Sequence, residues 1–194
     1  MIKFKVVVAG AKNVGKTSLL RRFATGKFER STLSTIGVDF ETKKVIVDDT
    51  EILLNIWDFA GEKKFRLLFP SYVSGASGAL MLYDITNKES LNDLHDWYNV
   101  ISSVPNPPKT KILIEAKIDL KRKVKREDAL NIFKKYKFSG EMLGTSSKTG
   151  ENVEKAFEML GREILKNSLK KCPNCGKMYP QELKFCQYCG AKTS

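Results

Sequence analysis

The chain has 194 residues, of which 42% are hydrophobic and 29% charged, and this composition excludes wholesale disorder. Lysine and arginine number 34 against 22 acidic residues, which gives a formal net charge of +12 at pH 7. This balance favours anionic partners such as nucleotide phosphates, nucleic acid or acidic membrane surfaces, without choosing between them. No apolar run approaches the roughly 18 residues of a transmembrane helix, and the N-terminal run is too short for a signal peptide. We therefore expect a cytoplasmic protein.

Apolar, β-branched runs alternate with helical patterns along most of the chain. The runs predict strands over residues 3–9, 38–47, 52–58, 78–84, 111–116 and 141–144. The helical patterns cover residues 15–25, 65–74, 90–103, 126–136 and 151–169. Such alternation is typical of an α/β fold with a mostly parallel sheet and helices on both faces. A cysteine-rich tail follows the last helix, so we expect two domains, over residues 1–169 and 170–194.

Residues 10–17 read Gly-Ala-Lys-Asn-Val-Gly-Lys-Thr and match the phosphate-loop pattern G-x-x-x-x-G-K-[ST] between a predicted strand and a predicted helix. Gly10 and Gly15 allow the backbone to curl until its N–H groups face one point, where the helix N-terminus adds partial positive charge. Lys16 supplies a charge for the β- and γ-phosphates, and the Thr17 hydroxyl can ligate Mg²⁺. The pattern therefore predicts a nucleoside triphosphate site.

Three further segments carry groups that complete such a site. Asp58, at a strand end, can hold Mg²⁺ through water, and the Thr35 hydroxyl can complete the Mg²⁺ shell. Gly61 can offer its backbone N–H to the γ-phosphate. Asp119 can accept hydrogen bonds from N1–H and the N2 amine of guanine, a donor pair that adenine lacks. Such a mismatch can be worth on the order of 10⁴-fold, so the sequence predicts a preference for guanine.

In their order and spacing, these motifs resemble those of the Ras superfamily of small GTPases, and most of all the Rab branch. The resemblance covers residues 2–169 and is most specific over residues 34–40, 57–66, 83–86 and 145–150. It implies the P-loop NTPase fold of a small G domain, with a six-stranded sheet. It also implies a GTP-hydrolysing switch in membrane trafficking or signalling, whose loops at residues 28–40 and 58–74 respond to nucleotide state.

The resemblance also assigns roles residue by residue. Thr17, Thr35 and Asp58 would ligate Mg²⁺, and Phe28 would stack on the base. The catalytic group would comprise Lys16, Thr35, Gly61 and Glu62. The full nucleotide-binding set would comprise Lys12, Asn13, Val14, Gly15, Lys16, Thr17, Ser18, Phe28, Thr35, Gly61, Lys117, Asp119, Ser146, Ser147 and Lys148.

The resemblance implies protein partners as well. Effector proteins would bind between Thr32 and Phe40 and between Trp57 and Tyr72, besides exchange and activating proteins. Phe40, Trp57 and Tyr72 match an exposed aromatic triad with which Rab proteins meet effectors. Ordinary packing on the sheet is the other interpretation of Phe40 and Trp57, because large aromatic residues are often partly buried without a partner.

Three positions depart from the family pattern. Glu62 stands where the family usually has the Gln that orients the attacking water, so we expect slow intrinsic hydrolysis. Lys12 could place a charge at the β–γ bridge or lie solvated at the crest of the loop. Ala116 replaces an Asn that binds the base and braces the phosphate loop. Losing one hydrogen bond costs roughly 0.5–1.5 kcal/mol, so we expect weaker base binding and faster nucleotide exchange.

Two C-x-x-C-G turns, at residues 172–176 and 186–190, hold all four cysteines of the chain. Four thiolates in two such turns can bind Zn²⁺ tetrahedrally, through Cys172, Cys175, Cys186 and Cys189. The metal would supply the folding free energy that so short a segment cannot obtain from a hydrophobic core. Two disulfides or free thiols are the other interpretation. The tail therefore resembles a short zinc ribbon.

The tail and its approach are basic, with six Lys and one Glu between residues 166 and 194. The prenylation pattern is absent, so we expect no lipid anchor and, at most, peripheral contact with a membrane surface. The tail could instead contact protein or nucleic acid. Two alternative functions follow: a GTP-bound adaptor that barely hydrolyses, and a nucleic-acid-binding protein that acts through the tail. The basic run at residues 121–126 is expected to be a solvated surface.

Overall fold

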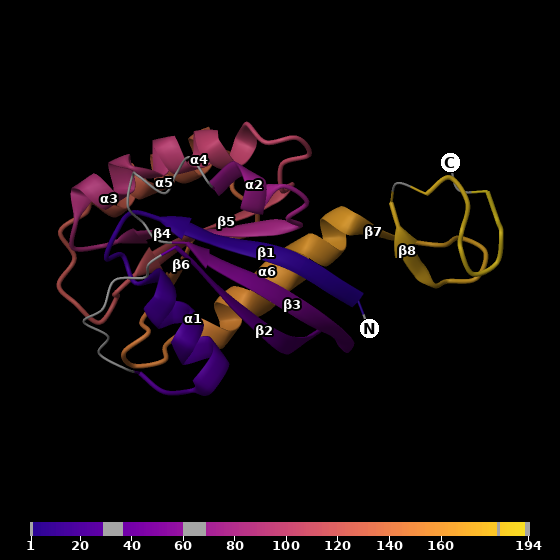
Figure 1. Cartoon of the computed structure of the whole chain (residues 1–194), viewed down its shortest axis with the longest axis horizontal. Coiled ribbons are helices and arrows are strands. Elements are labelled where there is room, and N and C mark those ends of the chain that lie inside the picture. The colour runs from indigo at the N-terminus through magenta and orange to yellow at the C-terminus, as the bar shows by residue number, and fades with distance from the viewer. Residues whose placement is uncertain (1, 29–36, 60–68, 182, 193–194) are drawn as a thin grey trace.

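A computed structural model of the chain describes residues 2–28, 37–59, 69–181 and 183–192. Its main sheet has six strands in the order β2-β3-β1-β4-β5-β6 (Figure 1). The β2–β3 pair is antiparallel and the other neighbours are parallel, which confirms the mostly parallel sheet. The strands are β1 (Ile2–Gly10), β2 (Val38–Val47), β3 (Thr50–Phe59), β4 (Gly78–Asp84), β5 (Thr110–Ala116) and β6 (Leu143–Thr145).

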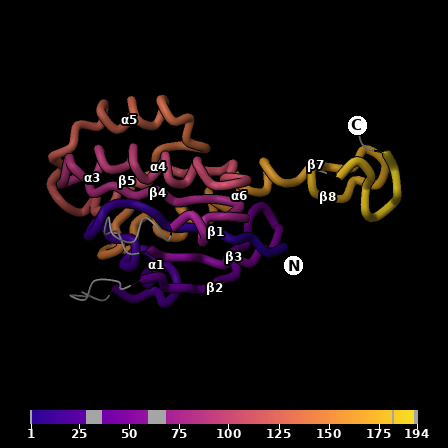
Figure 2. The backbone as a smooth tube through the Cα atoms, turned by 45° about the horizontal axis from the view of Figure 1, so that its top comes forward, coloured from indigo at the N-terminus to yellow at the C-terminus, as the bar shows by residue number. Residues whose placement is uncertain are grey.

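Helices cover both faces of this sheet, as the alternating pattern predicts (Figures 1 and 2). One face carries α1 (Lys16–Thr25) and α6 (Val153–Ser168). The opposite face carries α2 (Phe69–Val73), α3 (Lys88–Asn92), α4 (Leu94–Ser102) and α5 (Arg126–Lys135). Each layer encloses its own apolar core. The architecture is therefore a three-layer α/β fold.

Burial explains why the central strands read as continuous apolar runs. Val6, Val7 and Val8 of β1 are all fully buried, because helices cover both sides of the sheet. Side chains that point to one side join the core beneath α1 and α6, where the rings of Phe23 and Phe157 stack with their centroids 3.8 Å apart. Side chains that point to the other side join the core beneath α2 to α5.

The predicted helices differ in detail from those observed, and three of them differ most. The pattern at residues 90–103 is divided into α3 and α4, which meet at Asp93. The first of these helices begins earlier than predicted, because the Asn87 side chain accepts a hydrogen bond from the backbone N–H of Glu89 and caps it. The last predicted helix, at residues 151–169, begins two residues later, at Val153. Part of the helix predicted at residues 65–74 lies outside the described residues.

The tail forms a small unit at the end of α6. Strands β7 (Leu169–Lys171) and β8 (Met178–Pro180) form an antiparallel pair. The Gln181 side chain donates hydrogen bonds to the carbonyl oxygens of Lys166 and Leu169, at 2.9 and 3.1 Å. Carbonyl groups in the last helical turn have no partner within the helix, so Gln181 joins the tail to the end of α6. Figure 1 shows the tail at the opposite end of the molecule from the C-terminal ends of β1 and β4.

Candidate functional site

The phosphate loop lies between β1 and α1, and it encloses the ammonium group of Lys16. The Nζ atom of Lys16 donates hydrogen bonds to the carbonyl oxygens of Gly10 and Ala11, at 2.9 and 2.8 Å. Gly10 has a φ angle of 145°, and a Cβ atom there would lie 2.4 Å from the carbonyl oxygen of Leu82. Only glycine fits this close approach to β4, so the sequence pattern has a steric cause.

A hydroxyl and a carboxylate meet beside this loop. The Thr17 hydroxyl donates a hydrogen bond to Oδ2 of Asp58 at the end of β3. Asp58 is fully buried, and within the described part of the chain nothing donates to its Oδ1 atom. Hydroxyl and carboxylate oxygens are the donor types that Mg²⁺ prefers, so this pair fits a magnesium ion.

Burial changes the proton affinity of both charged groups. It raises the pKa of Asp58 to about 6, against the opposing effects of the Thr17 hydrogen bond and the Lys16 charge. It lowers the pKa of Lys16 to about 8, against the attraction of Asp58. Both shifts have one physical cause, since each charge has been removed from water. A cation beside Asp58 and an anion beside Lys16 would each offset part of that cost.

A cavity of about 400 Å³ adjoins the phosphate loop and has the size of a small-molecule site. Its walls bring together residues from four separate segments of the sequence. Eight of them belong to the predicted nucleotide-binding set: Val14, Gly15, Ser18, Phe28, Lys117, Asp119, Ser147 and Lys148. Ala116 and Leu120 complete the lining. Of the remaining predicted residues, Lys12 and Asn13 are exposed on the phosphate loop.

Two residues of the segment after β5 have fixed orientations. The Ser146 hydroxyl donates a hydrogen bond of 2.7 Å to Oδ1 of Asp119. The Nζ atom of Lys117 donates to the carbonyl oxygen of Asn13, at 2.7 Å, and so joins this segment to the phosphate loop. Sequence reasoning missed a further partner of Lys117, because its Nζ lies 2.6 Å from Oδ2 of Asp84. Asp84 could have been identified from the sequence, because it is an acidic residue at the C-terminal end of a buried strand, and the same feature identified Asp58.

The predicted aromatic triad lies together on one surface. The ring centroids of Phe40 and Trp57 are 5.0 Å apart, and those of Trp57 and Tyr72 are 5.6 Å apart. Phe40 is 49% exposed, while Trp57 and Tyr72 are half-buried. The three rings thus form one partly exposed surface. Four predicted residues, Thr32, Thr35, Gly61 and Glu62, lie outside the described residues.

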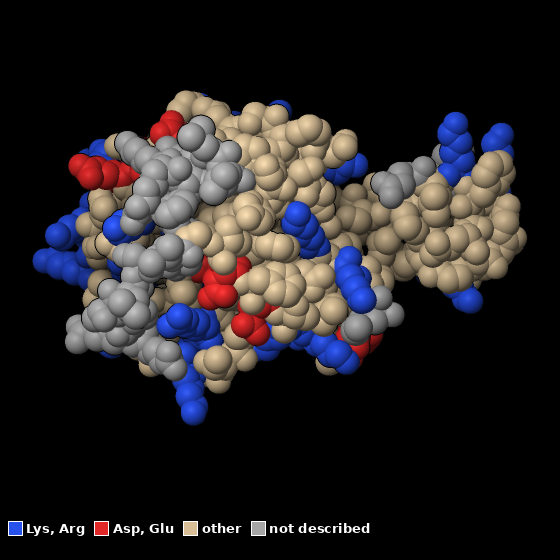
Figure 3. Space-filling model, in the orientation of Figure 1, with Lys and Arg blue, Asp and Glu red and all other residues tan. Residues whose placement is uncertain are grey.

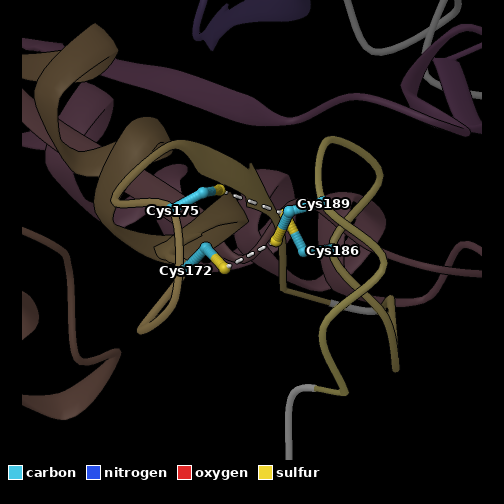
Figure 4. Close-up of side chains that lie close together, drawn as sticks. All are labelled: Cys172, Cys175, Cys186 and Cys189. Atoms are coloured by element: carbon cyan, nitrogen blue, oxygen red, sulfur yellow. Dashed lines mark hydrogen bonds between the residues drawn. The ribbon is translucent and has the colours of Figure 1, made fainter.

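The four cysteines of the tail form one cluster (Figure 4). Their Sγ atoms all lie within 4.8 Å of one another, and the Cys172–Cys189 and Cys175–Cys186 distances are both 3.7 Å. A tetrahedral zinc site with Zn–S bonds of about 2.3 Å has S–S edges of about 3.8 Å. The four cysteines are free in this structure and are not joined as the two disulfides of the alternative interpretation. The cluster therefore fits a tetrahedral thiolate metal site.

Hydrogen-bond donors favour the thiolate form at one corner of this cluster. The backbone N–H of Ala191 and the side-chain amide of Asn174 lower the pKa of Cys189 to about 6. The Asn174 nitrogen lies 3.6 Å from the Cys189 sulfur. A thiolate is the form of cysteine that binds metals, so the local backbone is arranged for ligation.

Comparisons with known proteins agree with the fold and the cavity. Residues 5–166 match the family described as the Ras family, and residues 167–194 match a domain of unknown function, DUF7575. The chain belongs to the Ras family, whose members are small GTPases that bind GTP and GDP. The family prediction made from the motifs is confirmed.

Several relatives carry Rab names. The chain is 34% identical to Ras-related protein Rab-13 of Canis lupus familiaris over 94% of its length and 91% of that protein. It is 38% identical to Ras-related protein Rab-1 of Theileria parva over 88% of its length and 78% of that protein. Among the helices of the described residues, none is both long enough and apolar enough to span a membrane.

The Asp58 carboxyl gives a testable pH dependence. Its folded-state pKa of about 6 exceeds its ordinary value of 3.8, so the folded protein binds this proton more tightly than the unfolded chain. Without nucleotide and with a chelator present, this group should therefore lower stability as the pH rises from about 4 to 6, by about 3 kcal/mol. Denaturant unfolding measures the effect, and Asp58→Asn should flatten it.

Asp49→Asn is the matched control, because Asp49 is an exposed turn residue with a φ angle of 64° that Asn tolerates. The free energy of unfolding of this control should change with pH as it does in the native protein. An Asp58→Asn profile identical to that of the native protein would contradict the assigned cost of burial.

Proposed function

We propose that this chain is a guanine-nucleotide-dependent switch that binds GTP and GDP with Mg²⁺ and hydrolyses GTP slowly. The observation that carries the proposal is the position of Asp119 in the wall of a cavity that adjoins the Lys16 loop. The cavity has space for a base beside Asp119, and the loop has charge and N–H groups for the phosphates. Ser146 holds Oδ1 of Asp119, so the carboxylate has a defined orientation.

Each loop would then have one task. Phe28, at one wall, would stack on the base, and Lys117 would pack along the base and sugar. Lys16 and the loop N–H groups would bind the phosphates. Thr17 would ligate Mg²⁺ directly and Asp58 would hold it through water, with Thr35 as a further ligand. When bound, Mg²⁺ would neutralise charge on the phosphates.

Selectivity for guanine is the decisive test. The native protein should bind GTP on the order of 10⁴-fold more tightly than ATP, because adenine offers the Asp119 carboxylate no donor pair. Asp119→Ala should reduce this ratio to about tenfold or less, measured by calorimetry in Mg²⁺. Asp128→Ala, which removes a carboxylate from the surface of α5, should leave the ratio unchanged. Equal affinity of the native protein for both triphosphates would refute the proposed function.

Hydrolysis would proceed by in-line attack of water on the γ-phosphate. Lys16, Mg²⁺ and the loop N–H groups would stabilise the charge that develops in the transition state. Gly61 would sense the γ-phosphate, and Lys12 would extend its charge toward the β–γ bridge. Glu62 would repel the γ-phosphate and orient water poorly, which supports a slow reaction.

The single-turnover rate of GTP hydrolysis tests the role of Glu62. We expect Glu62→Gln to raise this rate by about tenfold or more, because the amide removes the repulsion and can orient water. Glu51→Gln, at an exposed position of β3, should leave the rate unchanged. A native rate that is immeasurably slow would favour the GTP-bound adaptor instead. If Glu62→Gln lowers the rate of hydrolysis, then the Glu62 carboxylate assists hydrolysis in the native protein.

The aromatic surface formed by Phe40, Trp57 and Tyr72 is the proposed contact for effector proteins. It links β2, β3 and α2, which flank the two loops that the family resemblance assigns to nucleotide sensing. An effector on this surface would therefore read the nucleotide state.

The tail is proposed as a separate zinc ribbon over residues 170–194, attached to a G domain over residues 1–169. The S–S spacing of the cluster supports zinc. Tyr179 packs against Cys172 and Cys186 in an apolar cluster so small that the metal would dominate its stability.

The surface of this ribbon supports contact with an anionic bilayer. Four large apolar side chains are exposed on the tail: Met178, Leu183, Phe185 and Tyr188. Lys177 lies over the Tyr188 ring at 5.0 Å, and on the face in Figure 3 the described residues of the tail present lysines. Exposed apolar groups next to lysines fit the interface of an anionic membrane, so we propose a cytoplasmic protein that binds such membranes peripherally.

Full-length variants test the tail. Native mass spectrometry should find one zinc ion per chain, and Cys172→Ser/Cys175→Ser should lose it. Phe185→Ser/Tyr188→Ser should keep the zinc and bind phosphatidylserine vesicles about tenfold more weakly, because two apolar rings no longer enter the bilayer. Ile46→Ser, at an exposed apolar position on β2, should bind these vesicles like the native protein. Salt-dependent binding to RNA, without vesicle binding, would favour the nucleic-acid alternative.

A further inference from the structure

A carboxylate is buried directly before the residues proposed to read the base. Glu115, at the penultimate position of β5, has a side chain that is 4% exposed. Its Oε1 atom accepts two hydrogen bonds, one of 2.6 Å from the Tyr83 hydroxyl and one of 2.7 Å from Nη1 of Arg122. Arg122 belongs to the basic run that we expected to be a solvated surface, but its side chain is only 32% exposed.

The position of this ion pair along the chain gives it a specific consequence. Glu115 and Arg122 lie at the two ends of residues 116–121, which we name the base loop. Lys117 and Asp119 lie within it. The ion pair therefore joins the two residues that flank the base loop, and so closes the loop. Beyond Arg122, the backbone N–H groups of Lys123 and Val124 both donate to the carbonyl oxygen of Ile85, at 2.8 and 2.9 Å.

The electrostatics make this closure strong. A carboxylate with so little contact with water is stable only when it is paired and hydrogen-bonded, and Arg122 and Tyr83 provide one charge and one neutral donor. Burial and the hydrogen bond to Glu115 raise the pKa of the Tyr83 hydroxyl, so Tyr83 remains a donor at neutral pH. Tyr83 is itself fully buried in β4, so it fixes the carboxylate from the interior of the sheet.

Because position 116 is an alanine, the base loop depends on other contacts for its conformation. Ala116, which follows Glu115 and precedes Lys117 in the sequence, lines the cavity, and its methyl group forms no hydrogen bond. Two side chains within the base loop have partners outside it: Lys117 contacts Asn13 and Asp84, and Asp119 contacts Ser146. Each of these contacts acts on a single residue within the loop, whereas the ion pair joins its two ends.

We propose that Glu115 and Arg122, supported by Tyr83, are positioning residues that hold the base loop in its nucleotide-binding conformation and so set the rate at which guanine nucleotide dissociates. This inference rests on the proposed function, since the loop must read a guanine base. Neither residue lines the cavity proposed to hold the nucleotide. They act through Lys117 and Asp119, whose backbone they confine.

The dissociation rate of fluorescent GDP from the full-length protein with Mg²⁺ tests the proposal. Arg122→Met should accelerate dissociation by about tenfold or more, since the base loop loses its closure. Arg122→Lys, which keeps a charge near Glu115, should restore part of the slow rate. Arg126→Met, which removes an exposed arginine four residues later, should dissociate GDP like the native protein. An unchanged rate in Arg122→Met would overturn the proposal.

A second variant separates positioning from global stability. Arg122→Met leaves a buried charge unpaired and lowers stability, whereas Glu115→Gln/Arg122→Met removes both charges and should recover the native melting temperature. If the pair positions the loop, the double variant still dissociates GDP quickly. A double variant that regains both the native melting temperature and the native dissociation rate would overturn the positioning role. A native protein with no affinity for GDP would refute the proposed function itself, which the unchanged-rate result would not.

Discussion

The burial of one ammonium group organises the functional end of this protein. Lys16 is 5% exposed, and its charge is stabilised by the carbonyl oxygens of Gly10 and Ala11 and by the buried carboxylate of Asp58. These contacts require the chain to reverse tightly between β1 and α1, against the backbone of β4. An isolated buried charge would be very unfavourable, so the loop, the helix start and the end of β3 are held in one arrangement. The described residues that we propose to bind phosphate or Mg²⁺ depend on that arrangement.

A second set of buried charges extends this arrangement toward the base. Lys117 joins the base loop to Asn13 of the phosphate loop and to Asp84 of β4. Glu115 and Arg122 close the same loop on the other side of the sheet. Parallel strands place all these groups at one edge, because each strand ends there and its following loop begins there. In our proposal, electrostatic pairing takes the place of the hydrogen bonds that an amide at position 116 could have formed.

The tail occupies the opposite end of the molecule and depends on different physics. Among its described residues, the apolar core comprises Tyr179 and two buried cysteines with Ala191 beside them, so the proposed thiolate coordination would supply most of its order. Gln181 joins it to α6 by satisfying carbonyl groups of the last helical turn. If the exposed apolar surface of the tail binds a membrane, the C-terminal ends of β1 and β4, where the phosphate loop begins, lie at the end of the protein away from it (Figure 1).

The amino-acid sequence by itself determined the order of strands and helices, the Ras-family membership, the phosphate loop and the cysteine pairs. These features are local, because a strand, a glycine turn or a C-x-x-C spacing is encoded by neighbouring residues. Only the tertiary structure decided which distant side chains meet. Asp84 and Lys117, like Glu115 and Arg122, carry no motif that pairs them, and Arg122 looked like one more residue in a solvated basic run. Their partners are chosen by the register of β4 against β5, where Tyr83 lies opposite Glu115 and Asp84 opposite Ala116. Register depends on the packing of the whole sheet, and that is a property no short segment contains.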